Sequence, residues 1–181
     1  MAVEITYFVH GTTTDNEQHL ATGWADGELS ELGIKQSKEL DALVGDKKFD
    51  VVFCSDLKRA IDSANLSFDG KYRIIQDDRL RECNYGDFTQ HPVVEFKSDI
   101  LKFIDNPFPN GESYKDVEKR IKSFLDFLRK EYNGKHIAIV AHQAPQLALD
   151  VLLKDKTWQQ AIDEDWRKQK AWQPGWEYIV K

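Results

Sequence analysis

Residues 5–11 read Ile5-Thr6-Tyr7-Phe8-Val9-His10-Gly11, an apolar run that ends in a histidine. A second run far downstream, Ile137-Ala138-Ile139-Val140-Ala141-His142-Gln143, ends in the same way. Runs this apolar indicate buried strands. In an open α/β sheet, ligands bind beyond the carboxyl ends of the strands. If the two strands are parallel neighbours, His10 and His142 face one crevice, where an imidazole can act as nucleophile, base or metal ligand.

Candidate strands alternate with candidate helices along the rest of the chain. The predicted strands cover residues 3–9, 49–54, 72–75, 136–141 and 176–180. The predicted helices cover residues 31–44, about 57–65, 95–104, about 114–133, about 143–153 and 158–170. This alternation predicts one domain over residues 1–181, a three-layer α/β/α sandwich with a mostly parallel central sheet.

Several helix ends carry their own signals. Ser30 is the expected N-cap of the first long helix, and Ser55 or Asp56 that of the next. Ser113, with an acidic residue three positions on, resembles a capping box at the start of the longest helix. These signals place the chemically interesting residues on loops and at helix starts.

Composition limits the classes of protein that the chain can belong to. The formal net charge of −6 argues against a nucleic-acid-binding protein. No apolar run reaches about 18 residues, so no membrane span is expected. The N-terminus lacks a basic region followed by a long apolar stretch, which predicts a cytoplasmic protein without a signal peptide. The two cysteines are too few for a disulfide scaffold.

Three segments between the two histidines carry groups suited to an anionic ligand. Gly11 permits a tight turn and close approach to a ligand, and Asn16 offers a neutral hydrogen-bond donor. Arg59 falls in a first helical turn, where backbone amides and a guanidinium suit a phosphate. Glu82, beside Arg81, can hold or release a proton in a half-buried cleft. Taken singly, each segment also fits an ordinary turn, surface helix or solvated loop.

In their order and spacing, these segments resemble the histidine phosphatase superfamily, also called the phosphoglycerate mutase-like family. The resemblance runs from about residue 3 to residue 155 and implies a phosphoglycerate mutase-like fold. The positions that match are His10, Gly11, Thr14, Asn16, Asp26, Leu29, Ser30, Gly33, Gln36, Ser55, Leu57, Arg59, Ala60, Ala64, Leu80, Glu82, Gly86, Gly111, Glu112, Ser113 and His142.

The resemblance also implies a mechanism that needs no cofactor and no metal. His10 would attack phosphorus and become phosphohistidine, while Arg59 and His142 hold the phosphoryl oxygens. Glu82 would protonate the leaving oxygen and then help water to cleave the phosphoenzyme. The further donors to phosphate would be Asn16 and the amides near Gly11. The implied activity is hydrolysis of a small phosphorylated metabolite.

Two departures from the family pattern concern the chemistry itself. Val9 stands where the family has an arginine before the nucleophile, and Gln143 stands where a glycine follows the second histidine. Gln143, Arg81 and Lys58 are the candidates to replace the missing arginine, and phosphate affinity is expected to be weaker than in a typical member. The departure motivates an alternative, a non-catalytic descendant that binds a phosphorylated ligand or a protein. A mutase is less favoured, because the chain has little room for segments that close over the site.

Two other enzyme classes fit less of the sequence. The segment Phe8-Val9-His10-Gly11 also resembles the oxyanion loop of α/β-hydrolases, but the chain has no Gly-x-Ser-x-Gly nucleophile elbow. A metal-dependent hydrolase could use His10, His142, Asp15 and Glu82, yet no pair among them has the usual close ligand spacing.

Aromatic residues have two possible uses. Trp24, Tyr85 and Phe88 are candidates for apolar walls near the site, with core packing as the commoner reason for such residues. Trp158 and Trp166 lie eight positions apart and can share one helix face. The C-terminal tryptophans either pack on the protein's own core or form a homodimer surface; they are Trp158, Trp166, Trp172 and Trp176.

Overall fold

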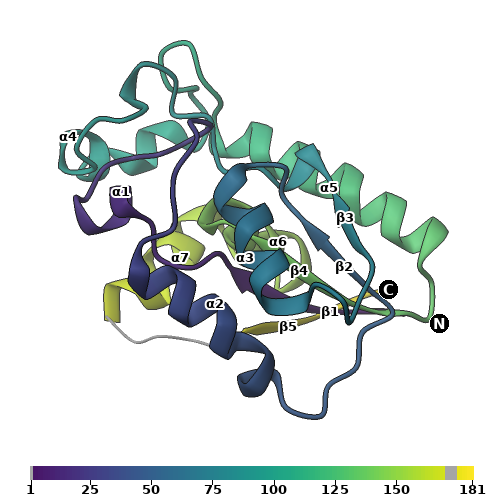
Figure 1. The fold of residues 1–181 in the computed structure, drawn as a ribbon. Coiled ribbons are helices and arrows are strands. Elements are labelled where there is room, and N and C mark those ends of the chain that lie inside the picture. The colour runs from purple at the N-terminus through teal and green to yellow at the C-terminus, as the bar shows by residue number, and fades with distance from the viewer. Residues whose placement is uncertain (1, 170–174) are drawn as a thin grey trace.

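One sheet organises the protein, of which the computed structural model describes residues 2–169 and 175–181. The strands found within those residues are β1 (Val3–Val9), β2 (Val51–Cys54), β3 (Ile74–Gln76), β4 (His136–Ala141) and β5 (Trp176–Val180). Their order across the sheet is β3-β2-β4-β1-β5 (Figure 1). Strands β1 to β4 run parallel, and β5 lies antiparallel to β1 at the edge. The predicted mostly parallel sheet is confirmed.

Helices connect the strands and lie on both faces of the sheet. The α-helices are α1 (Thr14–Glu17), α2 (Glu31–Val44), α3 (Lys58–Phe68), α4 (Val94–Lys97), α5 (Tyr114–Glu131), α6 (Gln143–Leu153) and α7 (Trp158–Asp163). The short 3-10 helices are η1 (Asp78–Leu80), η2 (Gly86–Phe88), η3 (Ile100–Phe103) and η4 (Trp166–Gln169).

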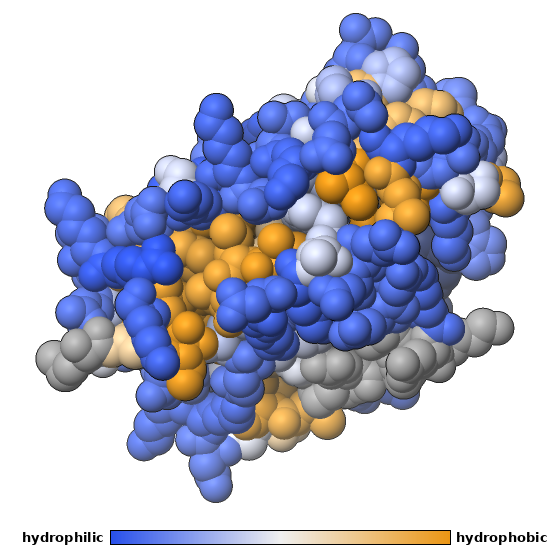
Figure 2. Space-filling view, turned by 180° about the vertical axis from the view of Figure 1, so that it is seen from behind, coloured by the Kyte–Doolittle hydropathy of each residue, from blue (hydrophilic) through white to orange (hydrophobic). Residues whose placement is uncertain are grey.

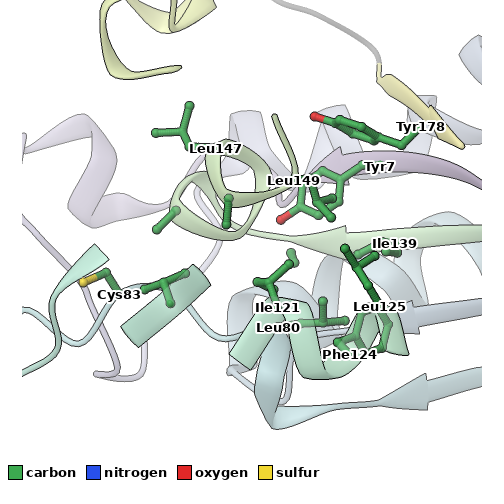
Figure 3. Close-up of a cluster of buried hydrophobic side chains, with 14 of the residues drawn as sticks. Tyr7, Leu80, Cys83, Ile121, Phe124, Leu125, Ile139, Leu147, Leu149 and Tyr178 are labelled. Carbon is green, nitrogen blue, oxygen red and sulfur yellow. The ribbon is translucent and has the colours of Figure 1, made fainter. Parts of the chain in front are cut away.

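Two separate clusters of buried side chains join the helices to the two faces of the sheet. On one face of the sheet, Leu40 of α2 and Phe68 of α3 pack in a cluster with Phe8 of β1. On the other face, α5 and α6 cover the sheet, in a larger cluster that includes Tyr7 and Ile121 (Figure 3). Neighbouring residues of β1 therefore point to opposite faces, as the alternation of side chains along a strand requires. The three-layer α/β/α sandwich is confirmed.

The pairing of β1 with β4 brings the two histidines together. Val9 lies opposite Ala141 in the parallel register, so the residues that follow both strands emerge side by side. The backbone N–H of His10 donates to the carbonyl of Ala141 at 3.0 Å. Two apolar runs separated by more than 120 residues thus end at the same edge of the sheet.

The prediction of one continuous helix over residues 95–104 is wrong. The structure has a single turn of α4, an interruption at Ser98 and Asp99, and then η3. The backbone N–H of Asp99 donates to the carbonyl of Phe96, and that of Lys102 to the carbonyl of Asp99, a three-residue spacing that marks 3-10 turns. Serine and aspartate are weak formers of helix interiors, which explains the break.

The predicted helix over residues 158–170 is also broken. Helix α7 ends at Asp163, and the Asp165 carboxylate accepts the backbone N–H of Arg167 at 3.0 Å, a local turn that competes with a continuous helix. Trp158 and Trp166 therefore do not share one helix. Trp158 and Trp176 are buried in the protein's own core, and Trp172 lies outside the described residues. A homodimer stays a prediction.

Smaller differences concern element ends. Strand β2 begins two residues later than predicted, and β3 covers 74–76 instead of 72–75. Helix α3 extends to Phe68 and has Leu57, whose side chain cannot accept a hydrogen bond, as its N-cap. Asp56 does not cap it, because its carboxylate holds Arg81 instead. The N-cap at Ser30 and the capping box at Ser113 are confirmed.

Candidate active site

The His10 ring is held in one tautomer beside a guanidinium. Its Nδ1 lies 2.7 Å from the carbonyl oxygen of Gly11. A carbonyl only accepts, so the proton of the neutral ring sits on Nδ1, and Nε2 carries the lone pair. Arg59 Nε donates to this Nε2 at 3.3 Å. Burial, and then the charge of Arg59, lower the pKa of His10 to about 3, so the ring is neutral at physiological pH and keeps a nucleophilic nitrogen.

Arg59 is a buried cation whose orientation is set by the backbone. Its side chain lies in the first turn of α3 and is 2% exposed. Its terminal nitrogens donate to the carbonyl oxygens of Gly23, at 2.8 Å, and Ala25, at 3.2 Å. These bonds fix the guanidinium plane and leave Nε pointing at His10. A planar fork of donors held in this way suits a tetrahedral anion.

His142 lies against His10, with ring centroids 5.0 Å apart. The backbone of His142 is clamped by Tyr7, whose hydroxyl donates to its carbonyl at 2.6 Å and accepts its N–H at 3.0 Å. The His142 ring is fully buried, and neither ring nitrogen has a hydrogen-bond partner within the described part of the chain. Burial, and then Arg59, hold the pKa of His142 well below its usual range. Unpartnered polar atoms at such a place are typical of a ligand-binding site.

The Glu82 carboxylate lies at the amino end of α6, next to the histidines. Its oxygens accept the backbone N–H groups of Cys83 at 2.8 Å, Ala144 at 3.1 Å and Gln143 at 3.2 Å. Helix N-termini attract negative charge, so α6 orients this side chain. The carbonyl of Glu82 also accepts from Trp24 Nε1 at 2.7 Å. Glu82 is thereby fixed through both its backbone and its carboxylate.

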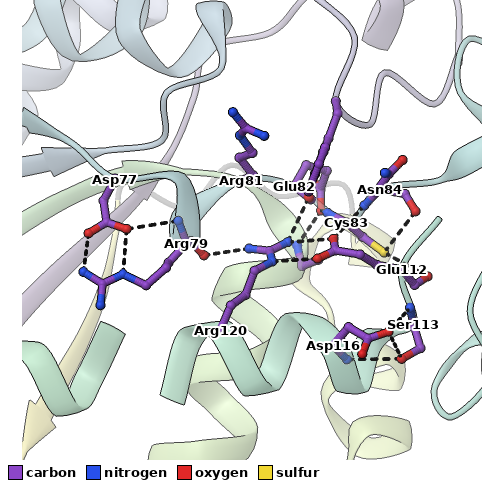
Figure 4. Close-up of polar contacts among 12 residues, drawn as sticks. Asp77, Arg79, Arg81, Glu82, Cys83, Asn84, Glu112, Ser113, Asp116 and Arg120 are labelled. Carbon is purple, nitrogen blue, oxygen red and sulfur yellow. Dashed lines mark hydrogen bonds and ion pairs between the residues drawn. The ribbon is translucent and has the colours of Figure 1, made fainter. Parts of the chain in front are cut away.

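A half-buried ion pair supports the loop that carries Glu82 (Figure 4). Glu112 accepts from Arg120 Nε at 3.0 Å and from the backbone N–H of Asn84 at 2.9 Å. Arg120 in turn donates to the carbonyl of Arg79 at 2.6 Å and to that of Glu82 at 2.9 Å. The Gly-Glu-Ser segment at the start of α5 therefore does not contact the histidines through these bonds. It holds the loop that carries Glu82 in place.

A cavity of about 400 Å³ opens beside these groups. Its polar lining residues include His10, Asn16, Arg59, Glu82 and Gln143, which the sequence had singled out. The Asn16 side-chain oxygen accepts the backbone N–H of Thr13 at 3.0 Å, so its amide NH₂ is the group it can offer to a ligand. His142 lies behind this lining, against the ring of His10.

Three residues expected near phosphate have other partners. The N–H of Gly11 donates to Ser63, and a Cβ on Gly11 would meet the carbonyl of Gly33 at 2.4 Å, so this glycine allows α2 to approach rather than a ligand. Arg81 makes a two-bond ion pair with Asp56, at 2.8 and 2.6 Å. Lys58 pairs with Asp62 and Glu28. Neither Arg81 nor Lys58 lines the cavity in the described structure; of the three candidates Gln143 does, and its side-chain amide donates to Asp165.

Sequence reasoning missed a second cation at the cavity. Arg167, in η4, lines the cavity, and its positive charge contributes to lowering the pKa of His10. Asp165 accepts from Arg167 Nη1 at 2.6 Å and also from the side-chain amide of Gln143. No local motif marks Arg167, because only the return of the chain after α7 brings it to the site.

Comparison with known proteins agrees with this geometry. Residues 7–173 match the family model of the histidine phosphatase superfamily (branch 1), and the chain belongs to that family. Phosphoserine phosphatase 1 of Hydrogenobacter thermophilus is 31% identical over 70% of this chain, and the fructose-2,6-bisphosphatase TIGAR of Xenopus tropicalis is 35% identical over 68%. The chain spans 64% and 49% of the length of these two relatives. Phosphoglycerate mutases match as well.

A solved structure of a phosphatase has a similar fold. The mycobacterial glucosyl-3-phosphoglycerate phosphatase in complex with VO3 superposes with a TM-score of 0.73 and 26% identity, over 87% of this chain and 85% of that one.

Neither a membrane-spanning helix nor a metal-binding cluster occurs in the described residues. Among residues 2–169 and 175–181, no helix is both long and apolar enough to cross a membrane. In the same residues, no group of three or more histidine, cysteine or acidic side chains is arranged to hold a metal ion.

Proposed function

We propose that this protein is a phosphomonoester hydrolase that works through a phosphohistidine on His10, without a metal, on a small phosphorylated substrate. The observation that carries the proposal is the neutral His10 ring, with its Nε2 lone pair beside Arg59 and against the unpartnered ring of His142. This arrangement offers a nucleophile and donors for a phosphoryl group at one point.

The first step transfers the phosphoryl group to the protein. His10 Nε2 attacks phosphorus in line, the Nε2–P bond forms, and the bond from phosphorus to the ester oxygen breaks. Protonated Glu82 gives its proton to that leaving oxygen, so the alcohol departs neutral. Arg59 and His142 donate to the remaining phosphoryl oxygens, since positioning and charge stabilisation dominate phosphoryl transfer.

The second step returns the protein to its starting state. Water attacks phosphorus, Glu82 takes a proton from the water, and the Nε2–P bond breaks to release inorganic phosphate. Hydrolysis is favoured over transfer to a second substrate, because exposed Lys97 and Lys168 line the cavity and leave its mouth open to water.

Arg167 supplies the positive charge that the valine at position 9 cannot. It lines the same cavity as His10 and acts on the same ring electrostatically. Its link through Asp165 to Gln143 holds it near the amino end of α6. The phosphoryl group would therefore meet two guanidinium groups, one from α3 and one from η4.

Steady-state hydrolysis of p-nitrophenyl phosphate in the presence of a chelator tests the proposal. Turnover should persist with the chelator and vanish in His10→Gln and His10→Ala. Chelator-sensitive turnover would contradict the metal-independent mechanism. If the wild-type chain binds phosphate but turns over no ester, the alternative of a non-catalytic phospho-ligand-binding descendant takes its place.

A further inference from the structure

Beyond its polar groups, the cavity at His10 is walled by apolar side chains. These come from separate segments of the chain, which are the loop after α1, the α4–η3 region, α6 and α7. The apolar lining residues are Leu20, Ala21, Val93, Phe96, Ile100, Leu147 and Ile162. A phosphoryl group fills only a small part of about 400 Å³, so these walls surround the space for the alcohol part of a substrate.

The tyrosines of the cavity add little polarity to these walls. Tyr85 and Tyr114 both line the cavity. Burial raises the pKa of both well above the usual value, so both hydroxyls stay neutral. Each side chain carries a single polar atom on a large ring, so the two tyrosines present mainly carbon to the cavity. A polyhydroxylated alcohol would therefore leave several of its hydroxyls without partners.

The aromatic wall is rigid and continues into the core. Phe96 packs against Tyr85, with ring centroids 5.4 Å apart, and against Phe108 at 5.3 Å. Phe88, expected from the sequence as a possible wall, lies in the same aromatic group at 5.4 Å from Phe96 and supports the wall from outside the cavity. The shape of the apolar space is thus set before a ligand enters.

Charged side chains line the cavity at its mouth, at the reaction centre and at the ion pair between Asp165 and Arg167. Lys97 and Lys168 line the cavity and are exposed, so they lie at its rim. The face seen in Figure 2 shows apolar atoms gathered in areas ringed by hydrophilic ones, one of them toward the end of the molecule that carries α4. Positive charge at the rim attracts a phosphate dianion, whereas the walls behind it select an apolar group.

We propose that the substrates are phosphomonoesters of apolar alcohols with an aromatic ring or a branched chain of similar size, rather than of sugars or other polyhydroxy compounds. The inference rests on the proposed phosphatase function and names its substrate class. It differs from the substrates in the names of the relatives, phosphoserine and fructose bisphosphate, both of which carry polar groups.

The test compares alkyl esters whose alcohols are equally poor leaving groups. Differences in kcat/KM then reflect how the alcohol part binds and not how easily it leaves. The series is ethyl, n-butyl and 2-phenylethyl phosphate, with glycerol 1-phosphate as the polar member. We expect kcat/KM to rise by about 10-fold or more from ethyl to 2-phenylethyl phosphate. One methylene group that fits an apolar pocket can already raise kcat/KM by about 10- to 200-fold. Glycerol 1-phosphate should be no better than the ethyl ester.

Two adjacent valines provide a matched pair of variants. Val93 lines the cavity, whereas Val94 is 78% exposed and lies outside the lining within the described residues. Val93→Asn should remove most of the preference for 2-phenylethyl over ethyl phosphate while ethyl phosphate turnover stays within a few-fold. Val94→Asn should leave both rates unchanged. Val93→Thr keeps the shape of the side chain and should lose less of this preference. It provides a second test if the asparagine variant does not fold.

The outcomes separate this inference from the proposed function. Equal rates for all four esters, or a preference for glycerol 1-phosphate, would overturn the apolar substrate class and leave the phosphatase proposal standing. If no ester is hydrolysed, the phosphatase proposal fails, and calorimetry with 2-phenylethylphosphonate and ethylphosphonate decides the substrate class. Tighter binding of the phenyl compound by about 10-fold supports the apolar site, and equal affinity rejects it.

Discussion

At the scale of single residues, the proposed chemistry depends on two histidines that stay neutral. Burial and Arg59 lower the pKa of His10 to about 3 and hold that of His142 well below its usual range. We expect that neither ring takes up a proton between pH 7 and pH 4.5 in ¹⁵N-edited NMR of the folded protein. Both should titrate near pH 6.5 in denaturant. A folded-state midpoint near 6.5 for His10 would contradict its assigned environment.

The same shifts have a consequence for stability, whose sign follows from proton uptake. Below about pH 6.5 the unfolded histidines bind protons that the folded ones do not, so acid favours the unfolded state. The free energy of unfolding should therefore fall as the pH drops from 6.5 toward 3. Urea melts at pH 7 and pH 5 measure the change, and His10→Gln should weaken this pH dependence. An unaltered slope in that variant would show that His10 does not contribute.

In the proposed mechanism, Arg59 acts through the shape of its guanidinium as well as through its charge. Arg59→Lys keeps the positive charge but cannot reach His10, Gly23 and Ala25 at once in the way the guanidinium does. We expect kcat/KM to fall by about 10²- to 10³-fold, the loss typical of removing one oriented donor to a transition state. The neighbouring Lys58→Met removes two surface ion pairs, with Glu28 and Asp62, and should change kcat/KM by less than about twofold. Retention of full activity by Arg59→Lys would remove Arg59 from the mechanism.

A variant of Arg167 tests whether this residue supplies the positive charge that the valine at position 9 cannot. Arg167→Gln should weaken inhibition by inorganic phosphate by about 10-fold, in line with the loss of one charge-assisted hydrogen bond. Arg129→Gln removes a surface arginine paired with Asp126 and serves as the control. Equal inhibition constants for both variants would show that Arg167 does not meet the phosphoryl group.

At the scale of elements, the pair between Glu112 and Arg120 connects α5 to the loop of Glu82. Glu112→Gln leaves Arg120 without its carboxylate partner and should lower the free energy of unfolding by about 1–3 kcal/mol. If Glu112 has a purely structural role, the substitution should change only the melting curve and leave kcat and its pH profile unchanged. If Glu112 also positions Glu82, kcat should fall while KM stays nearly constant, and the pH profile of kcat should change. Steady-state kinetics on the folded variant separates the two roles.

Elements also show why some predictions held and others did not. The strands at 3–9 and 136–141 and the cap at Ser113 were predictable, because their signals are local and strong. The breaks at Asp99 and Asp165 were not predictable, because local turns decide them against a continuous helical pattern: backbone 3-10 hydrogen bonds at Asp99, and the Asp165 carboxylate accepting the N–H of Arg167. Asp56 failed as a cap because a distant residue, Arg81, takes its carboxylate.

At the scale of the whole molecule, the sheet order explains the site. Placing β4 between β1 and β2 brings His10, Arg59 and His142 to one edge, as the resemblance to the family implied. The contribution of η4 could not be read from the sequence. Its Arg167 meets the cavity only because α7 ends at Asp163 and the chain turns at Asp165. The apolar wall was equally hidden, since its members are scattered over four segments and look like ordinary core residues.

The central claim is that His10 Nε2 carries the phosphoryl group, and trapping the phosphoenzyme tests it most directly. Protein mixed with 2-phenylethyl phosphate is quenched in alkali within milliseconds, because phosphohistidine is lost in acid. Peptide mass spectrometry and ³¹P NMR then locate the label. We predict one phosphoryl group on Nε2 of His10, absent from His10→Gln. Ester turnover with no label on His10, or with the label on another residue, would contradict the account.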